Sequence, residues 1–396
     1  MFLPVDPAGP AAAAGLYEVF REVRERTPVV RGPAGVQAVL THRAVSAVLR
    51  DRRFGWGAAE SVASHFGRDD DGRVVRQFIF MDPPDHTRLR SLVSNAFTAR
   101  MVERMRPRVE GVAADLIREV REKGAAGPVD LVATVADPMP ALVLGELMGV
   151  PDDTLRQFQE WSRSIARGLD PDFMLTPDEI AERQSARDNF NAYFGELAAQ
   201  RRVEPGDDLV SALVQTEIGE DQLSHIDLVT TCTLLLAAGY TTTSNLIGNS
   251  MQALLSHPDQ LALFRAGRDR TAEMVEELHR YDPPVQLVSR TALQAAEIDG
   301  NPVAAGEPVL LVIGAANRDP AVYDNPDHLD LTRRSDRQLG FGLGIHFCIG
   351  APLARLTAQV TLEALTELDL ALCAAEPTYT ENLVMRGLRE LPVTVA

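Results

Sequence analysis

Residues 341–350, FGLGIHFCIG, constrain this chain most, because they surround one cysteine with three glycines. Glycine has no side chain, so such a segment lets the backbone turn sharply and approach another group closely. No second cysteine lies near Cys348, so the segment does not resemble a zinc-binding knuckle. The pattern therefore raises the question of which group Cys348 contacts.

The chemistry of a thiolate narrows the possible partners of Cys348. A thiolate is a soft, strongly donating ligand that suits iron, and haem iron held by cysteine gains electron density that favours O–O cleavage. After Cys348 the sequence IGAPLARLTAQVTLEALTEL predicts a helix, whose positive N-terminal end would stabilise the thiolate. The alternative is a glycine-rich surface loop with an incidental cysteine.

The composition limits the fold and the partners. The 396 residues are 45% hydrophobic and 24% charged, which is ordinary for a globular protein with a large core. With 39 basic and 56 acidic residues the net charge is −17, so we expect no nucleic-acid partner. Three widely spaced cysteines do not indicate a disulfide framework. We expect Cys232 and Cys373, which lie in apolar runs, to be buried.

Hydrophobic periodicity predicts a mainly α fold with a minor β region. Apolar residues recur at helical spacing over residues 15–26, 100–124 and 185–217. Residues 28–41 alternate loosely, and residues 296–320 read as a hairpin segment with turns at Asp299-Gly300 and Ala305-Gly306. Because no linker or repeat interrupts the chain, we expect a single domain over residues 1–396.

One predicted helix, residues 226–256, is about 45 Å long at 1.5 Å per residue. Its first half is apolar nearly all round, which indicates a helix that runs through the core. Its middle holds Gly239 and three consecutive threonines, which are poor helix formers. Two interpretations remain open: a cavity lies beside the helix, or small residues allow close packing of a neighbouring helix.

Residues 341–350 resemble the haem-ligating signature of the cytochromes P450 at every defining position, and the resemblance extends over nearly the whole chain. It implies the cytochrome P450 fold, with haem b between the long central helix and the helix after the cysteine loop. Cys348 would be the iron ligand, and Phe341 and Gly344 would belong to the loop that contacts the haem. The chain would then be a haem-thiolate monooxygenase.

Further segments are similar to the family in the expected order. Glu277 and Arg280 match its Glu-x-x-Arg motif, and Arg333 matches an arginine that joins them in a buried ion network. Removal of one member would leave a buried charge uncompensated.

Four residues match positions that bind the haem propionates in this family: His86, Arg90, Arg290 and His346. His86 and Arg90 are four residues apart, so they share one helix face. Charge-assisted hydrogen bonds from Arg and His to carboxylates are strong, which suits this role.

The resemblance also implies partners and a reaction. Such enzymes use O2 and two electrons, which a ferredoxin and its reductase supply one at a time, to oxidise an unreactive C–H bond. We expect hydroxylation or epoxidation of a natural-product intermediate, such as a polyketide or an aromatic acid, either free or bound to a carrier protein. No secretion signal or apolar run of spanning length is evident, so we expect a cytoplasmic monomer with no membrane partner.

The sequence departs from the family in the central helix. Thr242 matches the threonine that holds the water which protonates dioxygen, but Thr241 replaces the acid that usually precedes it. A hydroxyl can bind water and has no proton of suitable acidity to give. Three interpretations follow: another proton route with ordinary hydroxylation or epoxidation, a coupling or desaturation reaction, or slow and leaky turnover. A non-catalytic haem sensor is the alternative from another functional class.

The substrate pocket is expected to be bounded by residues 56–80, by the region after residues 151–161, by Tyr240 and by residues 285–289. These segments mix apolar residues with polar and charged ones. We therefore expect a substrate that is larger than a simple alkane and not purely hydrocarbon.

Overall fold

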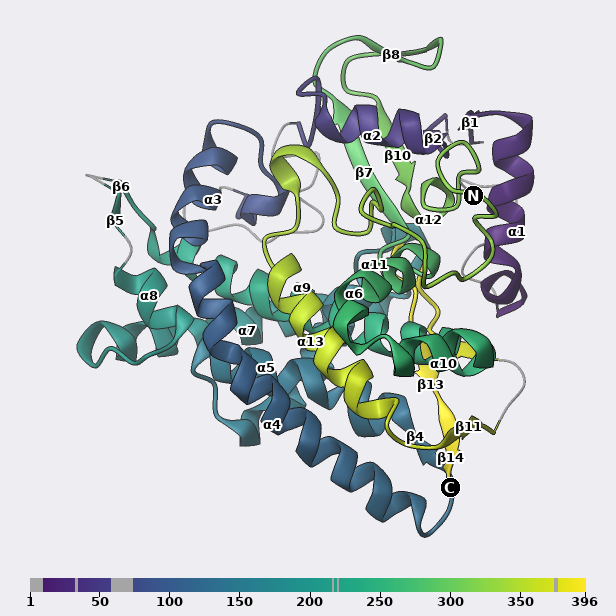
Figure 1. The fold of residues 1–396 in the computed structure, drawn as a ribbon. Helices are drawn as coiled ribbons and strands as arrows, with labels where there is room; N and C mark the ends of the chain where they lie inside the picture. The colour runs from purple at the N-terminus through teal and green to yellow at the C-terminus, as the bar shows by residue number, and fades with distance from the viewer. Residues whose placement is uncertain (1–9, 33–34, 58–73, 216, 219–220, 374–376) are drawn as a thin grey trace. The chain divides into compact units, whose positions relative to one another are not determined.

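The computed structural model describes residues 10–32, 35–57, 74–215, 217–218, 221–373 and 377–396. Helices dominate these residues, and most strands are short (Figure 1), which confirms the predicted mainly α fold. The helices are α1 (Pro10–Arg26), α2 (His42–Arg50), α3 (Asp85–Ala96), α4 (Ala99–Gly124), α5 (Pro138–Met148), α6 (Leu155–Arg167), α7 (Pro177–Val203), α8 (Leu209–Gln215), α9 (His225–Ser256), α10 (Pro258–Ala266), α11 (Thr271–Tyr281), α12 (Ile313–Ala316) and α13 (Ala351–Leu365).

The largest sheet has the strand order β1-β2-β10-β7-β3. Its strands are β1 (Val29–Arg31), β2 (Gln37–Val39), β3 (Phe54–Gly55), β7 (Leu287–Ala292) and β10 (Pro308–Val312). Strand β10 pairs antiparallel with β7 and parallel with β2. One face of this sheet packs against α2, where Val45 and Leu49 are buried with Val309 and Leu311.

Both predicted turns between residues 296 and 308 are confirmed. Strands β8 (Ala296–Ile298) and β9 (Asn301–Val303) form a hairpin that projects beyond α2 (Figure 1). At its turn Asp299 and Gly300 have φ values of 49° and 78°, as a two-residue hairpin turn requires. The second turn closes through the Glu307 N–H, which donates to the Ala304 carbonyl.

The smaller sheets join distant parts of the chain. Strands β11 (Leu370–Leu372), β14 (Pro392–Val395) and β4 (Val129–Asp130) form one sheet in that order. Two-stranded sheets pair β12 (Thr378–Tyr379) with β13 (Leu388–Glu390), and β5 (Glu217–Ile218) with β6 (Asp221–Gln222).

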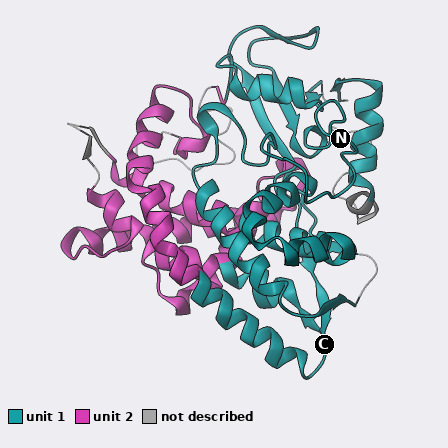
Figure 2. Cartoon of the chain, in the orientation of Figure 1, with its two compact units in different colours: residues 1–55, 110–139, 242–396 teal, residues 56–109, 140–241 magenta. Residues whose placement is uncertain are grey.

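The described chain divides into two compact units, drawn in two colours in Figure 2. Unit 1 comprises residues 1–55, 110–139 and 242–396, and unit 2 comprises residues 56–109 and 140–241. Each unit is assembled from separated stretches of sequence, and the division falls inside α4, α5 and α9. Unit 1 holds the five-stranded sheet, α11 and α13, whereas α3, α6, α7 and α8 belong to unit 2.

The long predicted helix is confirmed as α9, which is continuous from His225 to Ser256. Its threonine-rich middle does not interrupt the helix. At Gly239 a Cβ atom would lie 3.1 Å from Leu144 of α5, so this glycine allows close packing within unit 2. At that position the close-packing interpretation is confirmed. No helix among the described residues is long and apolar enough to span a membrane.

The expectations for the two other cysteines had different outcomes. Cys232 is buried in α9, as predicted, and burial raises the pKa of its thiol far above the usual value. The prediction for Cys373 was wrong, because this residue is exposed. It follows β11, which lies at the edge of its sheet, so the apolar run LALC marks an edge strand with one buried residue, Leu370, rather than a core segment.

Candidate haem site

Cys348 lies in a closed loop that leads directly into α13. The Cys348 N–H donates to the Phe341 carbonyl at 2.9 Å, and the Gly342 N–H donates to the Leu339 carbonyl at 2.8 Å. The short helix η7 (Gly344–His346) occupies the middle of the loop. Helix α13 begins with proline in its first turn, where the missing N–H costs nothing. The predicted helix after Cys348 is confirmed.

Gly344 shows why this loop needs glycine. Its φ is +70°, which disfavours any residue with a side chain. A Cβ atom here would lie 2.5 Å from the Leu49 carbonyl oxygen of α2. The loop therefore touches the backbone of α2 at a point where only hydrogen fits, which confirms that glycine serves close approach in this segment.

Phe341 lies between two helices of unit 1. Its ring centroid is 4.3 Å from that of His279 on α11, in an edge-on arrangement. The Arg355 guanidinium of α13 lies 4.4 Å from the same centroid. The sequence prediction assigned Phe341 to the loop but did not include His279 or Arg355. The available signal was periodicity, because His279 follows Val275 by four residues and shares its buried face.

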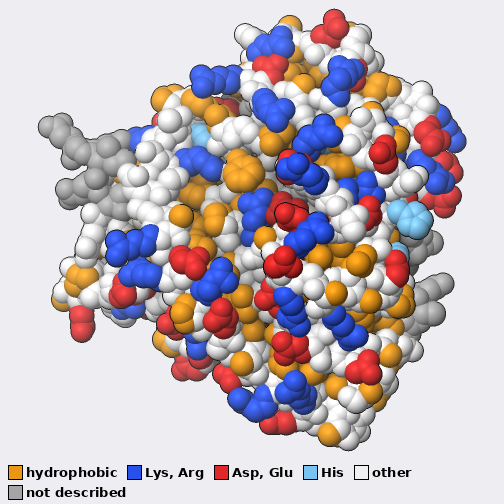
Figure 3. Space-filling view, in the orientation of Figure 1, with side chains coloured by type: hydrophobic (Ala, Val, Ile, Leu, Met, Phe, Trp, Pro, Cys, Tyr) orange, Lys and Arg blue, Asp and Glu red, His pale blue; other side chains and the backbone are white. Residues whose placement is uncertain are grey.

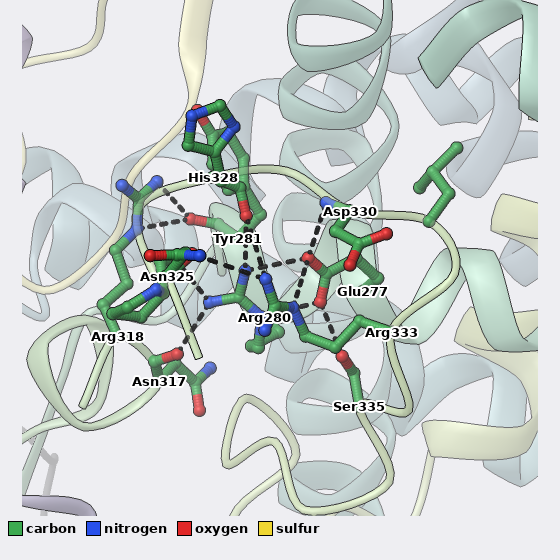
Figure 4. Close-up of polar contacts among 12 residues, drawn as sticks. Glu277, Arg280, Tyr281, Asn317, Arg318, Asn325, His328, Asp330, Arg333 and Ser335 are labelled. Atoms are coloured by element: carbon green, nitrogen blue, oxygen red, sulfur yellow. Dashed lines mark hydrogen bonds and ion pairs between the residues drawn. The ribbon is translucent and has the colours of Figure 1, made fainter. Parts of the chain in front are cut away.

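The predicted ion network of Glu277, Arg280 and Arg333 is confirmed (Figure 4). Glu277 and Arg280 are fully buried and joined by two hydrogen bonds, of 2.7 and 2.8 Å. Arg333 Nε lies 3.2 Å from Glu277 Oε1, and Ser335 Oγ donates to Glu277 Oε2.

Arg280 also donates to main-chain carbonyls, those of Asn317 and Pro326, each at 2.9 Å. Glu277 and Arg280 neutralise each other's charge, and Arg280 satisfies these carbonyls. The network therefore fixes the segment from residue 317 to 335 against α11.

The expected propionate-binding residues lie in both units. In unit 1, Arg290 is buried on β7, where its Nη1 donates to the Ser289 carbonyl at 2.7 Å, and His346 lies in the cysteine loop. In unit 2, His86 and Arg90 share helix α3, as predicted, and His86 is buried. An ion pair of 3.3 Å between Arg88 and Asp227 connects α3 to α9 within unit 2.

The middle of α9 carries the two candidate threonines. Thr241 Oγ1 is buried and has no hydrogen-bond partner among the described residues, so this hydroxyl has capacity for water or a ligand. Tyr240 is buried, and the Arg163 guanidinium of α6 lies 5.9 Å from its ring centroid. Ala238 is exposed. Of the expected pocket segments, residues 58–73 lie outside the described part of the chain.

The donor set around Cys348 suits haem. Within the described residues no group of three or more His, Cys, Asp or Glu side chains could hold a metal ion. Haem iron is held in a porphyrin that supplies most of its ligands, so a single protein thiolate such as that of Cys348 suits it. The buried cation of Arg290 adds a partner for carboxylates.

The surface charge is mixed on the face drawn in Figure 3. Basic and acidic side chains alternate there, so the negative total charge is not gathered into one block on that face. Ion pairs between exposed basic and acidic side chains contribute little to stability.

Comparison with known proteins connects these observations. The family model described as "Cytochrome P450" matches residues 12–266 and 269–378. The "Cytochrome P450 monooxygenase PikC" of Streptomyces venezuelae is 37% identical over 404 residues, covering 99% of this chain and 94% of the relative. The "6-deoxyerythronolide B hydroxylase" of Saccharopolyspora erythraea is 37% identical, with 95% of each chain covered.

A solved structure is also similar. It is that of P450BioI in complex with a fatty-acid-ligated acyl carrier protein, with a TM-score of 0.87 and 32% identity, covering 98% of this chain and 99% of that one.

Proposed function

The chain belongs to the cytochrome P450 family, and on this premise we propose that Cys348 is its iron ligand. Members of the family are monooxygenases that bind haem b through a cysteine thiolate, and the haem, when bound, supplies the activation of O2. One observation carries the assignment: the cysteine loop closes through the Cys348 N–H and the Phe341 carbonyl directly before α13. Cys232 is buried inside a helix and Cys373 follows an edge strand, so neither has such a setting.

We propose that Arg290 and His346 in unit 1, and His86 and Arg90 in unit 2, hold the two haem propionates. The position of Arg290 supports this role, because it is buried on β7 and charge-assisted hydrogen bonds from a guanidinium to a carboxylate are strong. We further propose that residues 1–396 act as one domain, which the match of a single family model to residues 12–266 and 269–378 supports.

We propose that Thr242 holds a proton-delivering water and that Thr241 extends the water chain. The capacity of the buried Thr241 Oγ1 for a further hydrogen bond supports this. A hydroxyl relays protons by accepting one hydrogen bond while donating another, so it can replace the transport role of an acid. It cannot replace the acid as a proton source, so the protons would come from water or from the substrate.

We propose a polyketide or a similar natural-product intermediate as the substrate, either free or bound to a carrier protein. One relative is named as a hydroxylase of 6-deoxyerythronolide B, and one structural relative was solved with an acyl carrier protein. Tyr240 precedes the two proposed threonines on α9, and the Arg163 guanidinium lies 5.9 Å from its ring centroid, so apolar and polar groups lie near the proposed site. Hydroxylation or epoxidation is the proposed reaction.

We further propose a ferredoxin and a ferredoxin reductase as electron donors, and a monomer that works in the cytoplasm. The chain would then take electrons singly, as a one-electron carrier delivers them. Desaturation or coupling is the second candidate reaction, and the hydroxyl at position 241 in place of an acid is the observation that favours it.

Turnover with defined substrates tests the proposal. The purified protein would be supplied with ferredoxin, reductase and reduced nicotinamide cofactor, then offered free macrolide precursors, aromatic acids and carrier-bound acyl chains. A product that has gained one oxygen supports the proposed reaction. A product that has lost two hydrogens or has been coupled supports the second candidate. Ligand-induced spectral changes without product from any donor would contradict both and indicate a sensor.

A further inference from the structure

A partly buried cluster of side chains behind the cysteine loop is not explained by haem binding or by the Glu277–Arg280 network. Its centre is His279 of α11, which is 4% exposed and packs edge-on against Phe341. The loop is also close to the imidazole at Gly340, where a Cβ atom would collide with the His279 ring. Gly340 and Phe341 therefore rest on this side chain.

Hydrogen bonds fix the orientation of Gln338 in this cluster. The Gly340 N–H donates to Gln338 Oε1, so the Gln338 amide nitrogen faces the other way. That nitrogen lies 3.1 Å from Glu276 Oε2 and 3.2 Å from His279 Nδ1. Since an amide nitrogen only donates, His279 Nδ1 accepts, and the imidazole is neutral.

Glu276 and Arg355 complete the cluster. Arg355 of α13 binds both carboxylate oxygens of Glu276, at 2.5 and 3.0 Å. Its guanidinium also lies over the Phe341 ring. Burial raises the pKa of Glu276, but the hydrogen bonds from Arg355 and Gln338 outweigh this effect and the pKa is lowered. The Glu276 carboxylate therefore stays charged and keeps its hydrogen bonds from Arg355 and Gln338.

The cluster connects to the sulfur through one residue. Phe341 presents its ring to His279 and Arg355, and its carbonyl accepts the N–H of Cys348. Any displacement of Phe341 would therefore move or break the hydrogen bond that holds the Cys348 main chain.

We propose that His279 is a positioning residue for the thiolate: its neutral imidazole, held by Gln338, braces Phe341 and so fixes the carbonyl that binds Cys348 N–H. The consequence for iron rests on the proposed function, in which Cys348 is the haem ligand. The mechanical part does not, because it concerns only the loop and α11.

Two substitutions separate the functions of the imidazole. His279→Leu removes the ring and the acceptor, and it leaves a Gln338 N–H without its partner. His279→Asn keeps an acceptor near the position of Nδ1 and removes the ring edge. His225→Asn is the matched control, because His225 is an exposed histidine at the start of α9 in unit 2.

Amide hydrogen exchange of residues 339–348 is the first readout, and the spectrum of the reduced protein with carbon monoxide is the second. We expect the Cys348 amide to exchange at least about tenfold faster in His279→Leu, and to an intermediate degree in His279→Asn. The fraction of the carbon monoxide complex that shows a neutral-thiol spectrum should rise in the same order. His225→Asn should match the unsubstituted protein in both readouts.

Unchanged Cys348 exchange in both His279 variants would overturn the proposal. If His279→Leu does not fold, His279→Asn decides by the same two outcomes, since it keeps the Gln338 hydrogen bond. Failure of the proposed function gives a different result: the unsubstituted protein would lack a thiolate-type spectrum, while the exchange difference between variants would persist.

Discussion

The backbone N–H of Cys348 donates to the carbonyl of Phe341 at 2.9 Å, so the loop closes on the residue that carries the sulfur. Within the same loop Gly344 has a positive φ, and its backbone lies against the Leu49 carbonyl.

Gly344→Ala should destabilise the protein by at least about 2 kcal/mol, because left-handed strain and a backbone collision add. Gly35→Ala is the control for strain alone, since Gly35 has φ +81° and its Cβ position has no contact within 4 Å from the described residues beyond its chain neighbours; it should cost about 1 kcal/mol. Urea unfolding of both variants measures the difference. Equal losses would show that the contact with α2 contributes nothing.

Glu277→Gln should cost about 3–5 kcal/mol of unfolding free energy, because Arg280 would remain as a buried charge without its partner. Glu273 lies on the same helix as Glu277 and forms an exposed ion pair with Arg270. Glu273→Gln should cost less than about 1 kcal/mol. Chemical denaturation of the two variants provides the comparison. A loss below about 1 kcal/mol for Glu277→Gln would contradict a stabilising role for the network.

Thr241→Glu should not raise the amount of product formed per reduced cofactor consumed, because the proposed water chain delivers protons without an acid at this position. Thr241→Val should lower that ratio, since it removes the hydroxyl and keeps the shape. Measurement of product and of cofactor consumption in parallel tests both. A large gain in rate and coupling for Thr241→Glu would mean that the natural relay is simply defective.

Stability should fall as the pH drops from about 6.5 to about 4, partly because of His279. Burial lowers the pKa of His279 from 6.5 to about 4. The nearby Arg355 charge also lowers this pKa, whereas the Glu276 charge raises it. Between these two pH values the unfolded chain binds a proton that the folded protein does not, so the free energy of unfolding decreases as the pH falls. The full gap corresponds to about 3 kcal/mol.

The pH measurement compares unfolding free energies of the unsubstituted protein and of His279→Asn at pH 7 and pH 4.5. The variant should lose less stability over this interval, because it lacks the titrating group. An identical loss in the two proteins would show that His279 is not the neutral buried group described.

Local motifs made several features of the fold around Cys348 and the β8–β9 turn predictable from sequence. The glycines around Cys348, the Glu277/Arg280 spacing and the turn at Asp299 each act within a few residues, and the structure has them as predicted. The His279 cluster was missed because it needs Gln338, Phe341 and Arg355, which are 59 or more residues further along the chain. Its formation depends on how α11, the cysteine loop and α13 pack.

Cys373 shows the opposite error. An apolar run predicts burial only where both faces of the segment are covered, and β11 lies at the edge of its sheet. Edge position is a property of the fold, and composition alone does not reveal it.

The bond between the Cys348 sulfur and haem iron is the central claim, and one measurement tests it most directly. Cys348→Ser and Cys373→Ser would be purified beside the unsubstituted protein after growth with ample haem precursor, then reduced and exposed to carbon monoxide. We predict the long-wavelength Soret band of a thiolate complex in the unsubstituted protein and in Cys373→Ser, and its loss in Cys348→Ser. A colourless unsubstituted protein, or an unaltered spectrum in Cys348→Ser, would contradict the account.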